Sequence, residues 1–161
     1  MSRVRSAWWL IVTSVLLAIL IALVPLPPEV SGLRPYWLAL VVAYWVLEAP
    51  ERVGLGAAFF AGLLADLAFG SLLGEQALRM VILAFVLDRF RNRVRFFPLW
   101  QQALVIGALL LNDRVVAAAV HFAAGVPAWP AIYWLSPLTG ALLWGPLFLL
   151  LESIRRRRGR K

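Results

Sequence analysis

The stretch GLLADLAFGSLLG, residues 62 to 74, decides how this chain folds. Its apolar residues are typical of a membrane-spanning helix, yet Asp66 stands among them, with glycines on either side. An ionised carboxylate in hydrocarbon costs at least about 2.5 kcal/mol, even on insertion-based scales. The stretch therefore predicts a densely packed helix in which a partner compensates the charge of Asp66.

The composition of the whole chain indicates a membrane protein. Its 161 residues are 63% hydrophobic, which is more apolar surface than a soluble domain of this size buries. There are no cysteines, so thiol chemistry is excluded, and a single histidine, His121, argues against a zinc-type metal site. We expect no cofactor and one transmembrane domain that covers residues 1–161.

Six apolar segments predict an all-α, polytopic six-helix bundle, since a transmembrane helix needs roughly 17 to 25 residues. The predicted spans are residues 7–24, 36–49, 54–69, 75–90, 99–124 and 131–151, followed by a basic tail at residues 152–161. The first span ends in prolines and not at a small-residue cleavage site, so we expect it to be retained. The alternative is five spans, with the short second or fourth segment re-entrant.

The distribution of basic residues favours six spans with both termini in the cytoplasm. In that topology 13 of the 16 basic residues lie in cytoplasmic segments, Arg34 lies outside, and Arg79 and Arg114 lie within spans. One span fewer would place either the cluster at residues 89–95 or the tail on the wrong side. Anchoring this topology and contacting anionic lipid accounts for the tail, so we expect no nucleic-acid binding.

Charged and polar residues inside the predicted spans gather toward their outer ends. At about 1.5 Å per residue along each helix, the residues at this depth are Asp66, Arg79, Asn112, Asp113, Arg114 and His121. We interpret them as a structural ion-pair layer in which Asp66 pairs with Arg79 or Arg114. The alternative interpretation is a pathway for a ligand or an ion.

Small residues recur every four positions along the third predicted span. One row is Gly54, Ala58, Gly62 and Asp66, and a second row is Ala57, Ala61 and Ala65. Small-residue faces let helix backbones approach closely, which is a main source of packing energy in lipid. We therefore expect the third span to be central, with Gly70 and Gly74 framing a tight turn before the fourth span. Ala18 and Ala22 form a similar pair on the first span.

Five stretches carry a resemblance to a known family. They are RPYW (34–37), LVVAYWVLEAPERVGLG (40–56), GLLADLAFGSLLGEQAL (62–78), LWQQALV (99–105) and WGPLFLLL (144–151). In their order and spacing they resemble the MreD family, a membrane component of the bacterial rod-shape machinery, in its proteobacterial form. The family motifs fall on Gly62, Asp66, Gly70, Leu73 and Gly74 in the third span, and on Arg34, Pro35 and Trp37 before the second. Asn112, Asp113, Arg114 and His121 match no family position.

The resemblance implies a non-enzymatic scaffold of the bacterial inner membrane. MreD-like proteins associate with MreC, a single-span periplasmic protein, and through it with actin-like MreB filaments. They act alongside RodA and a class-B penicillin-binding protein in building lateral-wall peptidoglycan. A lone partner helix would recognise a small-residue face, so we expect the MreC span on the first or third span of this chain.

A rival function follows from a similarity of fold. The MreD fold is similar to the substrate-capturing subunits of energy-coupling-factor transporters, which dock through small residues of the first helix and bind ligand near the outer side. The alternative is therefore a capture subunit that binds a small periplasmic ligand. An outer pocket whose polar groups are not satisfied by one another would favour it. A third alternative, an enzyme of peptidoglycan lipids, has no reactive set of residues to support it.

Overall fold

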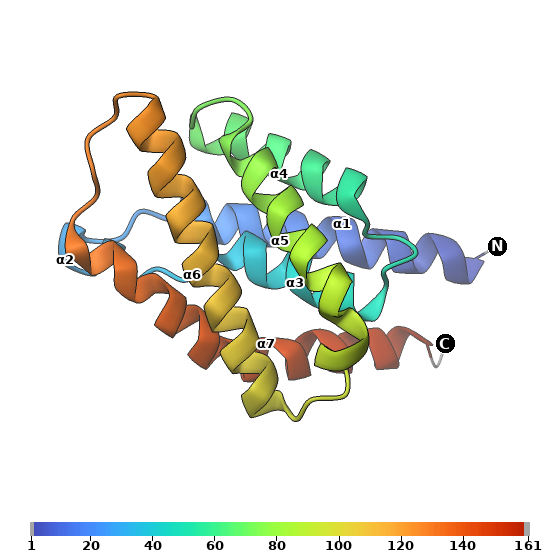
Figure 1. Cartoon of the computed structure of the whole chain (residues 1–161). Coiled ribbons are helices and arrows are strands. Elements are labelled where there is room, and N and C mark those ends of the chain that lie inside the picture. The colour runs from blue at the N-terminus through green and yellow to red at the C-terminus, as the bar shows by residue number, and fades with distance from the viewer. Residues whose placement is uncertain (1, 160–161) are drawn as a thin grey trace.

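The computed structural model describes residues 2–159, and this part of the chain is an all-α bundle (Figure 1). Its long helices are α1 (Ser2–Leu23), α3 (Trp37–Glu48), α4 (Leu55–Phe69), α5 (Glu75–Val94), α6 (Leu99–Ala123) and α7 (Ser136–Gly159). Two short elements, α2 (Pro28–Ser31) and the 3-10 helix η1 (Ala131–Leu135), precede α3 and α7. Each predicted span coincides with one long helix, although α7 continues into the predicted tail. Residues 160 and 161 of that tail lie outside the described residues.

Two of the helices have the length of membrane spans, and the surface of the bundle is apolar. Leu99–Ala123 and Ala131–Arg158 are long and apolar enough to cross a bilayer, and Ala7–Leu23, Trp37–Glu48 and Leu55–Phe69 are shorter apolar helices. Large apolar side chains point outward: Leu67 is 69% exposed, Leu142 is 78% exposed and Phe122 is 88% exposed. Such a surface is stable in hydrocarbon and not in water, so the architecture is consistent with a membrane protein.

The central helix is α3, and the prediction that the third span is central is wrong. Every residue from Leu38 to Leu47 is buried, and α3 contacts α1, α5, α6 and α7. By contrast, α4 packs on α5 and α1 while Phe60, Leu64 and Leu67 on its other face are exposed. Both helices are apolar on all sides, which suits a core position, so the hydrophobic pattern alone does not distinguish α3 from α4.

The small residues of α4 bring its backbone against α5. A Cβ atom added at Gly62 would lie 2.5 Å from Ala77 Cα and 2.5 Å from the Gln76 carbonyl oxygen, so this position holds only glycine. The other buried small residues of this helix are Ala58, Ala61 and Ala65. Gly54 precedes the helix and has open space around it, so it takes no part in the contact.

A tight turn joins α4 to α5, as the sequence predicts. Gly70 and Gly74 have φ angles of 62° and 94°, in the left-handed region that side chains rarely adopt. We call the end of the bundle that holds this turn the hairpin end; it also contains the end of α1, the start of α3 and the end of α6. Both chain termini lie at the opposite end, which we call the termini end (Figure 1).

The small pair of α1 is not an open docking face. Ala18 is 3% exposed and belongs to the apolar core. Ala22 lies one turn later, where it lines the pocket described below. The expectation that a partner helix reads this pair is therefore wrong for Ala18, since residues of the same chain already cover it.

Candidate functional site

Asp66 ties the end of α4 to the start of α5. The side chain is 2% exposed, and each carboxylate oxygen accepts two hydrogen bonds. Oδ1 accepts from Ser71 Oγ at 2.7 Å and from Gln76 N at 2.8 Å. Oδ2 accepts from Gly74 N at 2.8 Å and from Ala77 N at 3.4 Å. The first N–H groups of a helix have no acceptor within the helix, and they carry partial positive charge. The Asp66 carboxylate accepts hydrogen bonds from these groups of α5, and its negative charge is favourable beside them.

The predicted pairing of Asp66 with Arg79 or Arg114 is wrong. Among the side chains of residues 7–158, no arginine lies at salt-bridge distance from Asp66. The physical reason is the close backbone contact at Gly62, which brings the start of α5 beside the carboxylate. Backbone donors then fill its acceptor positions and compensate its charge.

Arg79 joins α5 to α6 through a buried ion pair. The arginine is 5% exposed, and it contacts Asp113 through Nε to Oδ1 at 2.8 Å and Nη2 to Oδ2 at 2.5 Å. This is the two-pronged geometry in which arginine and carboxylate bind most strongly. Nη1 lies 3.4 Å from Glu75 Oε1, and the guanidinium lies over the Tyr36 ring, 4.6 Å from its centre.

The ion pair continues into a wider polar network. Glu75 Oε2 lies 3.2 Å from His121 Nε2, so one carboxylate connects Arg79 to the end of α6. The other ring nitrogen of His121, Nδ1, is buried and has no hydrogen-bond partner in the part of the chain that the structure describes. On the neighbouring side, the Tyr36 hydroxyl donates to Gln76 Oε1.

Two further arginines reach this end of the bundle without a carboxylate partner among residues 2–159. Arg34 donates to the carbonyl oxygens of Ala22 and Val24, which caps the end of α1. Arg114 donates from Nη2 to Ser136 Oγ at 2.9 Å. Positive charge at a helix C-terminus is favourable, so Arg34 has a structural role, whereas Arg114 has one hydrogen bond and spare donors.

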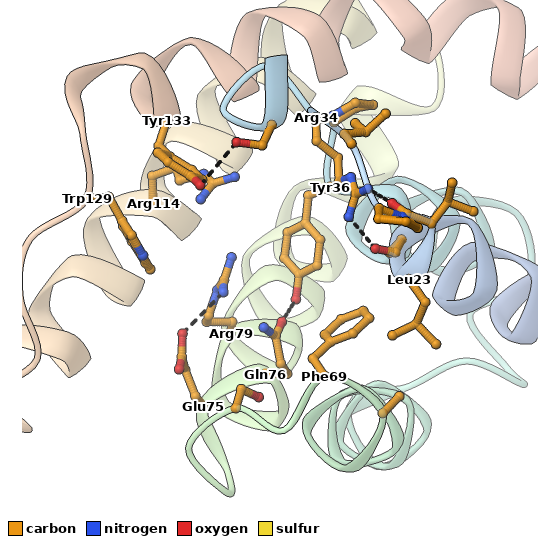
Figure 2. Close-up of a pocket in the computed structure, with 18 of the residues that line it drawn as sticks. Leu23, Arg34, Tyr36, Phe69, Glu75, Gln76, Arg79, Arg114, Trp129 and Tyr133 are labelled. Atoms are coloured by element: carbon orange, nitrogen blue, oxygen red, sulfur yellow. Dashed lines mark hydrogen bonds and ion pairs between the residues drawn. The ribbon is translucent and has the colours of Figure 1, made fainter. Parts of the chain in front are cut away.

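These side chains surround a pocket of about 560 Å³ at the hairpin end (Figure 2). Its polar lining includes Arg34, Tyr36, Glu75, Gln76, Arg79, Arg114, His121 and Tyr133. Its apolar lining comes mainly from the end of α1 and from Ala68 and Phe69 of α4. Within the described residues, no three His, Asp or Glu side chains are arranged to hold a metal ion.

The predicted polar residues have different fates. Asp113 and Arg114 point into the bundle, but Asn112 is exposed on the outside of α6. Of the family loop motif, Arg34 and Pro35 line the pocket, whereas Trp37 starts α3 and packs on the core.

Several residues of the site were missed by sequence reasoning. Glu75 stands four residues before Arg79, and this spacing on a helix was an available signal for a contact between them. Tyr36, Gln76 and Ser136 gave no such signal, because their partners are distant in the sequence.

Charges at the termini end form a second, more exposed network. Glu152 accepts hydrogen bonds from Tyr44 Oη at 2.9 Å and Arg156 Nε at 2.8 Å, and Arg155 Nη2 lies 2.8 Å from Glu48 Oε2. Partial burial raises the pKa of Glu152, but hydrogen bonds from Arg156, Tyr44 and Arg155 outweigh it and leave the pKa below its ordinary value. This network fastens the start of the tail to α3.

Fold and site together define a class: an all-α membrane protein whose helices are joined by buried polar contacts around a pocket at one end. Residues 3–154 match the family model of the rod shape-determining protein MreD. The chain is 34% identical over 158 residues to the rod shape-determining protein MreD of Haemophilus influenzae, an alignment that covers 97% of this chain and 96% of the relative. The chain therefore belongs to the MreD family, which confirms the resemblance seen in its motifs. No solved structure matches the chain.

Family membership implies a role in determining rod shape. MreD is a membrane protein, and its family is generally non-enzymatic. The family match extends from α1 into α7 and so includes the pocket and the polar network of the hairpin end; of the termini-end network it includes Glu48 and Glu152 but not Arg155 and Arg156.

Proposed function

We propose that this chain is a non-enzymatic, six-span scaffold of the bacterial inner membrane that binds MreC. Through MreC it would join MreB, RodA and a class-B penicillin-binding protein in lateral-wall peptidoglycan synthesis. The observation that carries this proposal is the match to MreD over residues 3–154, together with a bundle whose long helices all take part in one packed unit.

The two ends of the bundle support a cytoplasmic position for both termini. The basic residues of the termini end include Arg52, Arg89, Arg91, Arg93, Arg95 and Arg155–Arg158. The hairpin end has Arg34, Arg79 and Arg114, of which Arg79 is neutralised by Asp113. Basic residues concentrate on the cytoplasmic side of membrane proteins, so the hairpin end and its pocket face the periplasm in this proposal.

We place the MreC span along the outward face of α6. The small-residue faces of α1 and α4 are covered within the chain, at Ala18 and Gly62 respectively. Asn112 lies near the middle of α6 and is exposed, and its side chain makes no hydrogen bond to residues 7–158. An amide in hydrocarbon lacks a hydrogen-bond partner unless another helix supplies one, and in this proposal the single span of MreC supplies it.

Purification of the tagged chain from its native membranes in mild detergent tests the assembly. We expect mass spectrometry to identify an MreC-type single-span protein together with wall-synthesis enzymes. Recovery of a transport ATPase module in its place would contradict the scaffold and identify the chain as a capture subunit.

Cysteine crosslinking tests the position of the partner. The chain has no cysteine, so single cysteines can be placed without background. Cysteines at Ala108, Asn112 and Val115 on α6 are expected to crosslink to a cysteine in the MreC span. The matched positions are Leu64 and Leu67 on α4, which are equally open to lipid. Crosslinks from α4 alone would contradict the placement on α6.

The capture-subunit alternative has one observation on each side. The pocket contains Arg114 and His121, whose polar atoms are not all satisfied by neighbours in the described chain, and this favours a ligand. The small residue that would dock a transport subunit, Ala18, is buried. The pocket therefore supports ligand binding without supporting transport.

A further inference from the structure

The pocket at the hairpin end has one polar wall and one apolar wall (Figure 2). The polar wall includes Arg79 of α5, Arg114 and His121 of α6, and Tyr133 of η1. The apolar wall includes Leu23, Val24, Leu26 and Phe69. Its volume of about 560 Å³ is within the range of small-molecule sites. A ligand that matches both walls carries a polar group on an apolar chain.

The apolar wall is open to the surroundings of the bundle. Leu23 is 46% exposed, Val24 is 54% exposed and Leu26 is 42% exposed. These residues form the end of α1 and the turn after it, where a membrane helix reaches the lipid interface. A lipid chain can therefore lie against this wall without entering through water.

The charges that line the pocket do not balance. Arg79 is neutralised by Asp113, and Glu75 is shared between Arg79 and His121. Arg34 and Arg114 have no carboxylate at salt-bridge distance within residues 2–159. A recess lined with unbalanced positive charge attracts and holds an anion.

Arg114 is the group best placed to bind that anion. It uses one N–H donor, on Ser136 Oγ at 2.9 Å, and it lies over the Trp129 ring, 5.7 Å from its centre. Its other N–H donors have no partner among the described side chains and suit the two-pronged binding that phosphate favours. Arg79 and Arg114 point toward each other in Figure 2, so an anion between them would also reduce the repulsion of two like charges.

We propose that this pocket binds the phosphodiester of an anionic membrane lipid. The phosphate oxygens lie on Arg114, whose one hydrogen bond to Ser136 Oγ leaves further N–H donors of the guanidinium for them. One acyl chain lies along Leu23, Leu26 and Phe69. The inference requires the membrane location of the MreD family, and it does not require that the chain bind MreC.

Native mass spectrometry of the delipidated chain in detergent tests the proposal. The probe is dihexanoylphosphatidylglycerol below its micelle concentration, with dihexanoylphosphatidylcholine as the zwitterionic lipid of equal chain length. Inorganic phosphate separates a lipid headgroup from a free anion. We expect one saturable site for the phosphatidylglycerol and binding at least about ten-fold weaker for the other two probes. The trimethylammonium of phosphatidylcholine cancels the net charge of its phosphodiester and is repelled by the arginines, and inorganic phosphate has no acyl chain.

Matched variants locate the site. Arg114→Gln is expected to weaken phosphatidylglycerol binding by about ten- to a hundred-fold, the loss expected for a charge-assisted hydrogen bond. Arg157→Gln removes the same charge from the exposed tail and is expected to change nothing. Leu26→Asn, on an exposed loop, keeps the arginine and is expected to weaken the lipid several-fold while leaving phosphate binding unchanged.

Clear outcomes would overturn the proposal. Equal binding of the two lipids, or equal losses in Arg114→Gln and Arg157→Gln, would mean that the pocket does not select the anion. If inorganic phosphate binds as tightly as phosphatidylglycerol does, the ligand of the pocket is a soluble anion and not a lipid. If Arg114→Gln fails to fold, the Leu26→Asn comparison still decides, because unchanged lipid binding there contradicts an acyl chain on this wall. Co-purification of MreC with these variants is measured separately, so the lipid-binding proposal and the MreC-binding proposal can be contradicted independently of each other.

Discussion

Two buried aspartates at the hairpin end are stabilised in different ways. Asp66 is 2% exposed and is held by backbone N–H groups of the next helix and by Ser71. Asp113 is 3% exposed and is held by both prongs of Arg79. The first joins α4 to α5 across a short turn, and the second joins α5 to α6 through two residues that are 34 positions apart in the sequence. A buried carboxylate in a membrane bundle therefore need not indicate a buried arginine beside it.

The difference has a consequence for stability. The backbone N–H groups that bind Asp66 do not depend on which side chains the start of α5 carries, and they are polar but uncharged. The Arg79 charge, in contrast, is buried and depends on one side chain, Asp113, as its main partner. Loss of Asp113 should therefore be more damaging than loss of Asp66.

The largest effect is expected for Asp113→Ala. This change leaves the Arg79 guanidinium, 5% exposed, with the longer contact to Glu75 as its one carboxylate among the described residues and with the face of the Tyr36 ring. Removing one partner of a buried pair costs about 3–5 kcal/mol in the free energy of unfolding. Unfolding in mixed micelles with increasing denaturing detergent measures it, and a loss below 1 kcal/mol would mean that the pair adds little.

The close approach that positions Asp66 is the next target. Gly62→Val places a side chain 2.5 Å from the backbone of α5 and is expected to cost about 3 kcal/mol by overpacking. Gly56→Val is the control in the same helix, since nothing lies within 4 Å of that position. Equal losses for the two variants would show that α4 and α5 are not in close contact.

A smaller loss, about 2 kcal/mol, is expected for Asp66→Ala. The variant removes a charged cap and leaves buried N–H groups of α5 without an acceptor. Asp88→Ala on the exposed side of α5 serves as the control. Hydrogen exchange at Gln76 and Ala77 should increase in Asp66→Ala, and unchanged protection there would contradict the cap.

The smallest effect is expected at the termini end, where the charges are more exposed. The pKa of Glu152 is below its ordinary value of 4.5 in the folded chain, so its charge stabilises the fold above that pH. The contribution is lost as the pH falls through the lowered pKa. The stability difference between the native chain and Glu152→Gln, a few tenths of a kcal/mol, should be constant at neutral pH and shrink in acid. A difference that grows in acid would contradict the sign of the shift.

The helices could be predicted from the sequence, because the residues at their ends are themselves helix-breaking or turn-forming. Apolar runs end at prolines and glycines, and the positive φ angles of Gly70 and Gly74 are what a turn between two spans requires. The central position of α3 could not be predicted in this way, because α3 and α4 are both apolar on all sides. The small residues of α4 drew attention away from it.

The pairing of the charges was not accessible in the same way. Asn112, Asp113 and Arg114 are consecutive on one helix, so they point in directions about 100° apart, and only the packing decides which faces inward. Asp66 accepts hydrogen bonds mainly from backbone N–H groups. Nearly every residue has such a group, so the identity of the neighbouring residues does not predict these bonds. Sequence reasoning predicted a layer of charged residues at the hairpin end of the bundle, but it assigned the wrong partner to Asp66.

Two double-mutant cycles that share Arg79→Met test the central claim most directly. In the first, Arg79→Met is combined with Asp113→Ala; in the second, with Asp66→Ala. We predict a coupling free energy above about 2 kcal/mol for Asp113, because the double variant removes both charges of one pair. For Asp66 we predict additivity within about 0.5 kcal/mol. Strong coupling of Asp66 to Arg79, with additivity at Asp113, would contradict the account.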